Sequence, residues 1–387
     1  MIKIEKIIPG GQALGTDIDG KKIFFWNALP GEEVIEYEIT KKKSHYLEAI
    51  VTKIENPSKS RVEPKDKCFL STSPWQIIDF NYELQLKQSL VVELFREQNI
   101  TIDTPEIFTD NHEYFYRNKM EYALYWNKET EKIELAFHAR GSHRKIPINT
   151  SSLEKPEIFQ AATKIIDDLN KNHEEAFKYQ SLLLRANQNG EISGGLYENG
   201  KPHPIFKNLE DKILDKTYSY SPNGFFQINL PVYELALKEI QKHIFTDKVL
   251  DLYSGVGTIG LSVASNKDLT LVECDKSAYG EMVNNVKNSS LSNIKTKLAK
   301  SEEALEYIEE NMTVIVDPPR AGCDKKLIEK FLEVNPKKII YLSCNPATQA
   351  RDVKMLLKNY QIEDIKTFNF FPHTPHIENL VILKKIC

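Results

Sequence analysis

The sequence is poor in cysteine and contains no long apolar run. Only five of its 387 residues are cysteine, and no two of them form a CxxC pair. A disulfide framework or a local zinc knuckle is therefore not supported. The apolar runs are far shorter than the ~20 residues of a membrane-spanning helix, and the N-terminus lacks the apolar core of a signal peptide. We expect a cytoplasmic protein with no metal site and no membrane partner.

An excess of positive charge is also absent. The 51 Lys and Arg residues are outnumbered by 55 Asp and Glu, which gives a net charge of −4. This balance excludes nucleic-acid binding through overall basicity but allows a local basic face. Between Lys41 and Lys67, eight basic residues stand against four acidic ones. Charge alone does not decide between a solvated surface and a phosphate-binding patch.

The chain divides into three regions, which predicts a multidomain α/β protein. Residues 1–55 contain short strands separated by turns, a pattern typical of a small OB-like β-barrel. Residues 66–215 mix strands and helices, as in an α+β middle domain. Residues 216–387 alternate apolar strands with helices, which predicts a Rossmann-like, doubly wound sheet. A helix expected at 82–98 is a candidate to pack on this last region.

A glycine-rich loop follows the first apolar strand of the C-terminal region. The strand at 249–252 runs into Gly255 and Gly257 before a helical segment, so the backbone can turn tightly and approach a ligand. Glu273, which closes the next strand, would bind ribose hydroxyls. Both a dinucleotide and S-adenosylmethionine fit this arrangement. Asp251 favours S-adenosylmethionine, because a carboxylate suits its cationic amino-acid end better than a pyrophosphate.

A second motif places Asp317 at the end of another strand, followed by Pro-Pro-Arg. Open α/β sheets bind their ligands at this end of their strands. Base-modifying methyltransferases commonly carry an Asp/Asn-Pro-Pro loop here. Enzymes that methylate exocyclic amines usually have an aromatic residue after the prolines. Arg320 stands at that position and argues against amine methylation.

A third motif ends a buried-type strand at Cys344, at the same edge of the predicted sheet. There, neighbouring cations or helix termini could stabilise its thiolate. Addition of a thiolate to carbon 6 of a pyrimidine makes carbon 5 nucleophilic enough to accept a methyl group. A general base must then remove the proton from carbon 5. Glu378 is our candidate, with His373 and His376 as alternatives.

Taken together in this order, the motifs resemble those of the RNA uracil-C5 methyltransferases, a bacterial family with an N-terminal TRAM domain. The matching segments are Phe225-Phe-Gln-Ile-Asn229, Asp251-Leu-Tyr-Ser-Gly-Val-Gly257, Asp317-Pro-Pro-Arg-Ala-Gly322, Ser343-Cys-Asn-Pro346 and His376-Ile-Glu378. Upstream, Tyr116-Arg-Asn-Lys119 and Arg140-Gly-Ser-His-Arg144 resemble the middle domain of that family, and residues 1–55 resemble TRAM. The resemblance covers nearly the whole chain.

The resemblance implies methylation of carbon 5 of a uridine in ribosomal or transfer RNA, by a monomer that uses S-adenosylmethionine. It implies that Cys344 is the nucleophile and Glu378 the base, with Asp317 at the junction of donor and base. The expected donor-binding residues are Gln227, Tyr253, Thr258, Glu273 and Asp317, together with Asp251, Gly255 and Gly257. The expected RNA contacts are Arg320, Arg117, Arg140, Arg144, Lys41, Lys42 and Lys43.

The sequence departs from this family at its iron–sulfur site. Many members bind a four-iron cluster through four cysteines, of which only Cys68 remains here. The segment at 148–152, which would carry another ligand, contains serine instead. Serine cannot replace a thiolate ligand on iron, so we expect no cluster.

Three other functions remain open at this point. An RNA cytosine-C5 methyltransferase would also use cysteine, and Cys323 lies near Asp317. However, enzymes of that class place the cysteine directly after Asp-x-Pro, where this chain has Arg320. A non-catalytic RNA-binding protein could retain the fold without the activity. A nicotinamide oxidoreductase would share the glycine loop but would have no need of the other two motifs.

Overall fold

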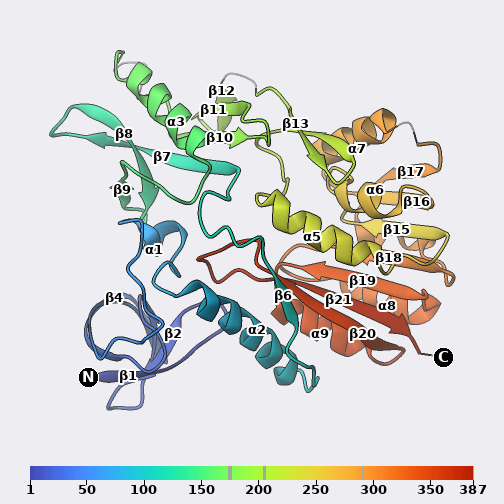
Figure 1. The fold of residues 1–387 in the computed structure, drawn as a ribbon, viewed down its shortest axis with the longest axis horizontal. Helices are drawn as coiled ribbons and strands as arrows, with labels where there is room; N and C mark the ends of the chain where they lie inside the picture. Colours follow the sequence, from blue (N-terminus) through green and yellow to red (C-terminus); the bar gives the residue numbers. More distant parts are fainter. Residues whose placement is uncertain (173–176, 204–205, 290, 387) are drawn as a thin grey trace.

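The computed structural model describes residues 1–172, 177–203, 206–289 and 291–386, so Cys387, the last residue of the third predicted region, lies outside the described residues. These residues form a closed barrel, a six-stranded sheet, a two-stranded sheet and an eight-stranded sheet (Figure 1). None of the described helices is both long and apolar enough to span a membrane. The predicted multidomain fold class is confirmed.

The N-terminal strands close into a barrel, as their spacing predicts. Its strands, which pair in the order β1-β2-β3-β5-β4, are β1 (Ile2–Ile7), β2 (Ala13–Thr16), β3 (Lys22–Trp26), β4 (Glu33–Lys42) and β5 (Tyr46–Glu55). Alternate side chains such as Ile4 and Phe25 are buried inside it. The chain leaving the barrel is tied back by Arg61, whose Nε lies 2.6 Å from Oε1 of the buried Glu32.

The middle of the chain forms an antiparallel sheet covered by one helix. In spatial order its strands are β12 (Lys201–His203), β11 (Ile192–Glu198), β10 (Ser181–Ala186), β7 (Lys119–Asn127), β8 (Lys132–His138) and β9 (Lys145–Pro147). Helix α3 (Pro156–Leu169) buries Ile158, Ala162 and Ile166 against it. A short helix, α1 (Phe69–Thr72), precedes this region.

The C-terminal sheet is the largest, and it is mixed rather than wholly parallel. In spatial order its strands are β17 (Ile294–Leu298), β16 (Asp268–Glu273), β15 (Lys248–Leu252), β18 (Met312–Val316), β19 (Lys338–Ser343), β21 (Glu378–Lys385), β20 (Tyr360–Phe368) and β6 (Glu106–Phe108). The first five are parallel, whereas β21 runs antiparallel to both β19 and β20. Because of this reversal, the start of β21 lies beside the end of β19.

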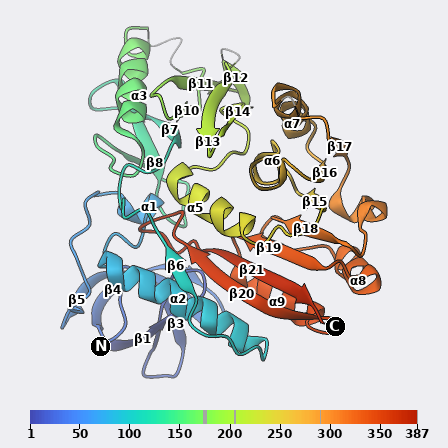
Figure 2. The ribbon, with the colours of Figure 1, turned by 45° about the vertical axis from the view of Figure 1, so that its right-hand side comes forward.

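Helices cover both faces of this sheet (Figure 2). One face packs against α5 (Leu230–Gln241), α6 (Thr258–Ala264) and α7 (Lys276–Asn288). The other packs against α2 (Phe80–Glu97), α8 (Lys325–Val334) and α9 (Pro346–Leu356). Two short 3₁₀ helices, η1 (Ser301–Glu303) and η2 (Leu305–Tyr307), precede β18. Successive strand residues alternate between the two cores, as in β15, where Val249 and Leu250 face opposite sides.

The sheets do not follow the three regions expected from the sequence. Helix α2, the helix expected at 82–98, packs on the C-terminal sheet as proposed, whereas strand β6, which also falls within 66–215, joins that sheet unexpectedly. The expected boundary between residues 215 and 216 falls within a hairpin formed by β13 (Leu209–Ile213) and β14 (Lys216–Tyr220). The barrel also contacts the start of the expected middle region, since Trp75 Nε1 donates to the carbonyl of Gly11 at 3.0 Å. One apolar core extends from the barrel to the α2 face of the sheet.

Candidate active site

The carboxyl ends of the central strands bring the three sequence motifs to one edge of the sheet. Leu252, the last residue of β15, pairs with Val272 of β16 and with Val316 of β18, and Val316 in turn pairs with Tyr341 of β19. The strand order reverses between β15 and β18, the position where open α/β sheets bind ligands. The glycine loop, Asp317 and Cys344 therefore follow neighbouring strand ends.

The glycine loop is closed by the carboxylate of Glu273. Gly255 and Gly257 have φ angles of 56° and 89°, in the left-handed region that favours glycine. Glu273 Oε2 accepts the N–H of Gly255 at 2.8 Å, and its Oε1 accepts the N–H groups of Cys274 and Asp275 at 2.7 and 2.6 Å. These bonds fix the carboxylate beside the loop, and each oxygen retains capacity to accept from a ligand hydroxyl.

Asp251 is a buried acid with one unused oxygen. Its Oδ2 accepts the N–H of Gly260 at 2.8 Å, whereas its Oδ1 is buried without a hydrogen-bond partner. Burial, together with the charges of Asp317 and Glu273, raises the pKa of Asp251 to about 8. A buried acid with a raised pKa and a free oxygen suits a cationic group of a ligand. Such a group would hydrogen bond to the free oxygen and favour the ionised carboxylate. The residues present thus fit a methyl donor with an ammonium group.

The other three expected donor-binding residues lie near this loop but differ in their surroundings. Tyr253 follows β15 with a positive φ of 63°, and burial raises the pKa of its hydroxyl, which bonds to Ser301. Thr258 is buried at the first position of α6. Gln227 is half-buried, and its backbone carbonyl accepts from Asn118 Nδ2 at 3.0 Å.

Cys344 and Glu378 lie beside the last pair of an antiparallel ladder. Ser343 of β19 pairs with Asn379 of β21; Cys344 follows the first of these residues, Glu378 precedes the second, and the charge of Glu378 acts on the Cys344 thiol. Glu378 is buried, and its burial, together with Asp317, raises its pKa well above the ordinary value. Burial also raises the pKa of the half-buried Cys344 to about 11, and the charges of Glu378 and Asp317 act in the same direction. This edge therefore favours the neutral thiol, in contrast to the stabilised thiolate that we expected.

Arg320 is the cation that opposes this effect. It hydrogen bonds to Cys344 and lowers the pKa of the thiol, although less than burial and the carboxylates raise it. Its guanidinium also bonds to His376 Nδ1 at 3.1 Å, and its carbonyl accepts from Asn345 Nδ2 at 2.8 Å. Burial, aided by Arg320, lowers the pKa of His376 to about 4, so this ring is neutral and can accept. Sequence analysis singled out Arg320 and His376, but no sequence pattern indicated that they pair.

The cations expected to contact RNA are distributed over the barrel, the middle sheet and the site. Lys42, Lys43 and Arg144 are exposed, whereas Lys41 pairs with Glu48 at 2.8 Å. The remaining expected cations are Arg117, Arg140 and Arg320, and all three contribute to lowering the pKa of His376, as does Lys87.

Arg140 has a role that its sequence motif did not reveal. Its Nε donates to the carbonyl of Leu70, and its guanidinium lies 4.3 Å from the centre of the Trp26 ring. This arginine therefore connects the barrel, α1 and the middle sheet.

The region that corresponds to the iron–sulfur site of the resembled family is held by oxygen contacts. Asp66 accepts the N–H and the hydroxyl of Ser152, at 3.1 and 2.7 Å. Cys68 is buried close by, and burial raises its pKa to about 11. Within the described ranges, no group of three or more His, Cys, Asp and Glu side chains is arranged to hold a metal. The expected absence of a cluster stays a prediction.

Cys323, the alternative nucleophile, lies in the apolar core rather than at this edge. Its N–H donates to Asp352 Oδ2 at 2.8 Å, and burial raises the pKa of its thiol. A buried, protonated thiol is a poor nucleophile. The geometry therefore disfavours the cytosine-type reading that depended on it.

Comparisons with known proteins indicate the family of this chain. A family model described as tRNA (uracil-5-)-methyltransferase matches residues 206–386. An uncharacterized RNA methyltransferase of Staphylococcus aureus (strain MSSA476) is 30% identical over 94% of this chain and 93% of its own. Another, from Lactobacillus johnsonii, is 29% identical over 97% of this chain and 96% of its own. The crystal structure of Pyrococcus abyssi tRNA (uracil-54, C5)-methyltransferase in complex with S-adenosyl-L-homocysteine superposes with a TM-score of 0.77, at 23% identity, over 99% of this chain and 100% of that chain.

The N-terminal barrel and the open, mixed sheet with a glycine loop after β15 are typical of a Rossmann-like methyltransferase with an added barrel. The relatives described above identify the family within this class. The chain belongs to the RNA (uracil-5-)-methyltransferase family, whose members depend on S-adenosylmethionine.

Proposed function

We propose that this protein methylates carbon 5 of a uridine in ribosomal or transfer RNA through a covalent bond between Cys344 and carbon 6. The observation that supports the proposal is the strand register at Ser343 and Asn379, next to Cys344 and Glu378, together with the action of Glu378, Asp317 and Arg320 on the Cys344 thiol. A nucleophile and an acid–base group at neighbouring positions are what methylation of a pyrimidine carbon requires.

The first step is the attack of Cys344 on the base. The thiol gives up its proton to solvent, Sγ forms a bond to carbon 6, and the electrons of the 5,6 double bond move toward the ring carbonyl. Arg320 assists because it hydrogen bonds to the sulfur and favours the thiolate. The target uridine must leave its stack to reach the sulfur, as other enzymes acting on enclosed bases require.

Bound S-adenosylmethionine supplies a methyl group carried on a positively charged sulfur. In this proposal Glu273 holds the ribose hydroxyls of the donor, and Asp251 holds its ammonium group. The fixed oxygens of Glu273 and the free Oδ1 of Asp251 support these assignments. Gln227, Tyr253, Thr258 and Asp317 complete the proposed donor site, with Asp317 toward the base.

Glu378 then completes the reaction as general base. Its carboxylate takes the proton from carbon 5, the electrons of that C–H bond restore the double bond, and the C6–sulfur bond breaks. Sulfur leaves as thiolate; protonation of the sulfur and loss of the proton taken up by Glu378 then return the site to its starting state. Burial raises the pKa of Glu378 above its ordinary value, and a carboxylate with a raised pKa binds the proton from carbon 5 more strongly.

RNA would be held by cations around the site and on the barrel. Arg117 and Arg140, from the middle of the chain, lower the pKa of His376 through their charges. Lys42, at the end of β4, and Lys43, which follows it, are exposed. Phosphate contacts of this kind position RNA without reading its sequence. A loop or single strand costs least to open and is our proposed form of the substrate.

The proposal is tested by mass spectrometry of RNA nucleosides from cells with and without this protein. We expect one 5-methyluridine site to be lost when the protein is removed and restored by the wild-type chain, but not by Cys344→Ala. Full restoration by Cys344→Ala would overturn the proposed mechanism. Loss of a methylated cytidine in place of a methylated uridine would overturn the proposed substrate.

A further inference from the structure

Helix α2 carries an ion pair with no exposed surface. The side chains of Glu83 and Lys87 are both fully buried, one turn apart, with Lys87 Nζ 2.8 Å from Glu83 Oε1. Burial lowers the pKa of Lys87, which shows that its charged form is costly at this position. A buried ion pair adds little to stability compared with apolar packing, but it can hold a specific arrangement. The contacts of this pair show which part of the structure it holds in place.

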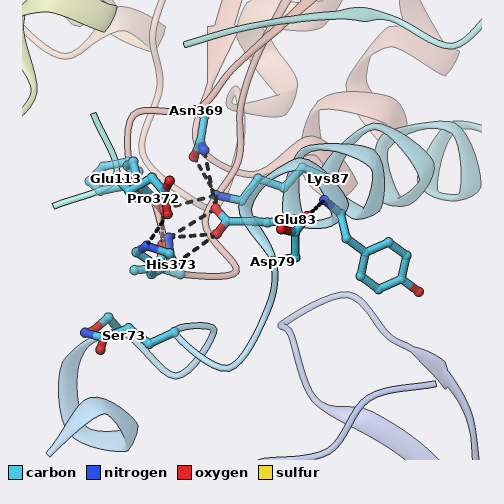
Figure 3. A network of polar contacts seen from close by, with 12 residues as sticks. Ser73, Asp79, Glu83, Lys87, Glu113, Asn369, Pro372 and His373 are labelled. Atoms are coloured by element: carbon cyan, nitrogen blue, oxygen red, sulfur yellow. Dashed lines mark hydrogen bonds and ion pairs between the residues drawn. The ribbon is translucent and has the colours of Figure 1, made fainter. Parts of the chain in front are cut away.

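The pair binds the loop between β20 and β21, residues 369–377 (Figure 3). Lys87 Nζ donates to Asn369 Oδ1 at 2.6 Å and to the carbonyl of Phe371 at 3.1 Å. The carboxylate of Glu83 accepts the N–H of His373 on both oxygens, at 3.1 and 2.9 Å. Each charge thus completes its hydrogen bonding with atoms of this one loop.

The backbone at the turn of the loop is strained and is held from several sides. His373 has a φ of 59°, an uncommon conformation for a side chain of its size. While Glu83 accepts its N–H, the carbonyl of His373 accepts from the backbone N–H of Trp75 at 3.0 Å. The hydroxyl of Tyr116 donates to the carbonyl of Pro372 at 3.1 Å. Strained residues persist only where their surroundings fix them in this way.

The loop leads directly to the proposed base. Glu378 is the first residue of β21, immediately after the loop. Within the loop, the N–H of His376 donates to Thr374 Oγ1 at 3.3 Å, and its ring accepts from Arg320. Any shift of the loop would therefore move Glu378 and the partner of Arg320 together.

We propose that Glu83 and Lys87 are positioning residues that fix the β20–β21 loop and, through it, the carboxylate of Glu378. This inference rests on the proposed function, because it assumes that Glu378 removes the proton from carbon 5. A small displacement of a catalytic group is enough to slow its step by about 10²-fold. The pair should therefore affect proton removal more than the attack of Cys344, whose strand end does not belong to the loop.

The test compares the full-length wild-type protein with the double variant Glu83→Gln/Lys87→Met, which removes both charges and leaves neither ion unpaired. The control pair, Lys325 and Glu329 on α8, has the same spacing but is exposed, and it receives the same changes, Lys325→Met/Glu329→Gln. Release of tritium from RNA that carries [5-³H]uridine measures proton removal. The rate of covalent trapping by 5-fluorouridine RNA measures the steps before it, because fluorine leaves no proton to remove.

We expect the double variant to release tritium about 10- to 100-fold more slowly, while its trapping rate stays close to that of the wild type and the control is unchanged in both. Lys87→Arg, which keeps the charge, should recover part of the tritium release. Equal losses in both rates, or no loss in either, would overturn the positioning role. If wild-type protein traps no 5-fluorouridine RNA, the proposed function itself fails, and the inference fails with it.

Discussion

At the scale of single residues, the notable feature is that the thiol of Cys344 lies among acids. Burial, Glu378 and Asp317 raise its pKa to about 11, and burial raises that of Asp317 to about 7. Only a small fraction of the thiol is therefore ionised at neutral pH. The rate of attack on the base should rise as pH rises through 7 to 10, because the thiolate is the nucleophile.

Arg320 should shift this pH dependence. In Arg320→Ala the cation that lowers the pKa of Cys344 is lost, so the thiol pKa rises further and attack at pH 7 should slow by about tenfold or more. Because the thiol pKa lies above 10 in both proteins, the deficit should stay nearly constant from pH 7 to 10. The measurement is the rate of trapping by 5-fluorouridine RNA across this range, with the exposed Arg96→Ala as control. No deficit at pH 7, or a deficit that disappears by pH 10, would contradict this role of Arg320.

At the scale of secondary-structure elements, most of the chemistry lies where strands end, and this is what could be predicted. Apolar runs ending at Asp251, Asp317 and Cys344 indicated strands, and parallel strands bring such ends to one edge. The reversal of β21 followed from no local pattern, because strand direction is set by packing and not by composition. The buried Glu83 and Lys87 were also beyond sequence reasoning, since charged residues on a helix are usually exposed.

The end of β15 gives an element-level prediction about protons. With a folded pKa of about 8, Asp251 is mostly protonated at pH 7, and the pKa lies above the ordinary value of an aspartate. In the absence of donor, the stability that this protonation contributes is therefore lost as pH rises toward 8. A bound ammonium group favours the carboxylate, so donor binding at pH 7 should release protons.

Calorimetry of S-adenosylmethionine binding in phosphate and in Tris measures this release, because the two buffers differ in ionisation enthalpy. We expect different apparent enthalpies for the wild type, and a smaller difference together with weaker binding for Asp251→Asn. Asp317 is a second buried acid with a raised pKa, so Asp317→Asn is measured in the same way to separate its protons from those of Asp251. Equal enthalpies for the wild type in both buffers would contradict the assignment of Asp251.

At the scale of the whole molecule, the barrel and the catalytic sheet share one apolar core. Removal of residues 1–55 would uncover this core, so the role of the barrel is better tested by surface charge. Lys42 ends β4 and Lys43 follows it, and both are exposed. Strand β4 lies far from α8 in the fold (Figure 1).

Lys42→Glu/Lys43→Glu should weaken RNA binding and flatten its dependence on salt, because each lost phosphate contact reduces the slope of log K against log salt by about 0.7–0.9. Lys325→Glu/Lys326→Glu on α8 provides a matched change of charge on an exposed helix. Binding is measured by titration at several salt concentrations. Equal slopes for the barrel variant and the wild type would show that these lysines do not contact RNA.

The covalent bond at Cys344 is the centre of this mechanism, and intact mass spectrometry of protein–RNA adducts tests it most directly. Wild-type protein with S-adenosylmethionine and 5-fluorouridine RNA should give a stable adduct that contains one added methyl group and is located at Cys344. Cys344→Ala should give none, whereas Glu378→Gln should accumulate an adduct even with ordinary uridine RNA, because loss of a general base slows release by about 10²–10⁴-fold. A Cys344→Ala protein that still forms the adduct, or still methylates uridine, would contradict the mechanism.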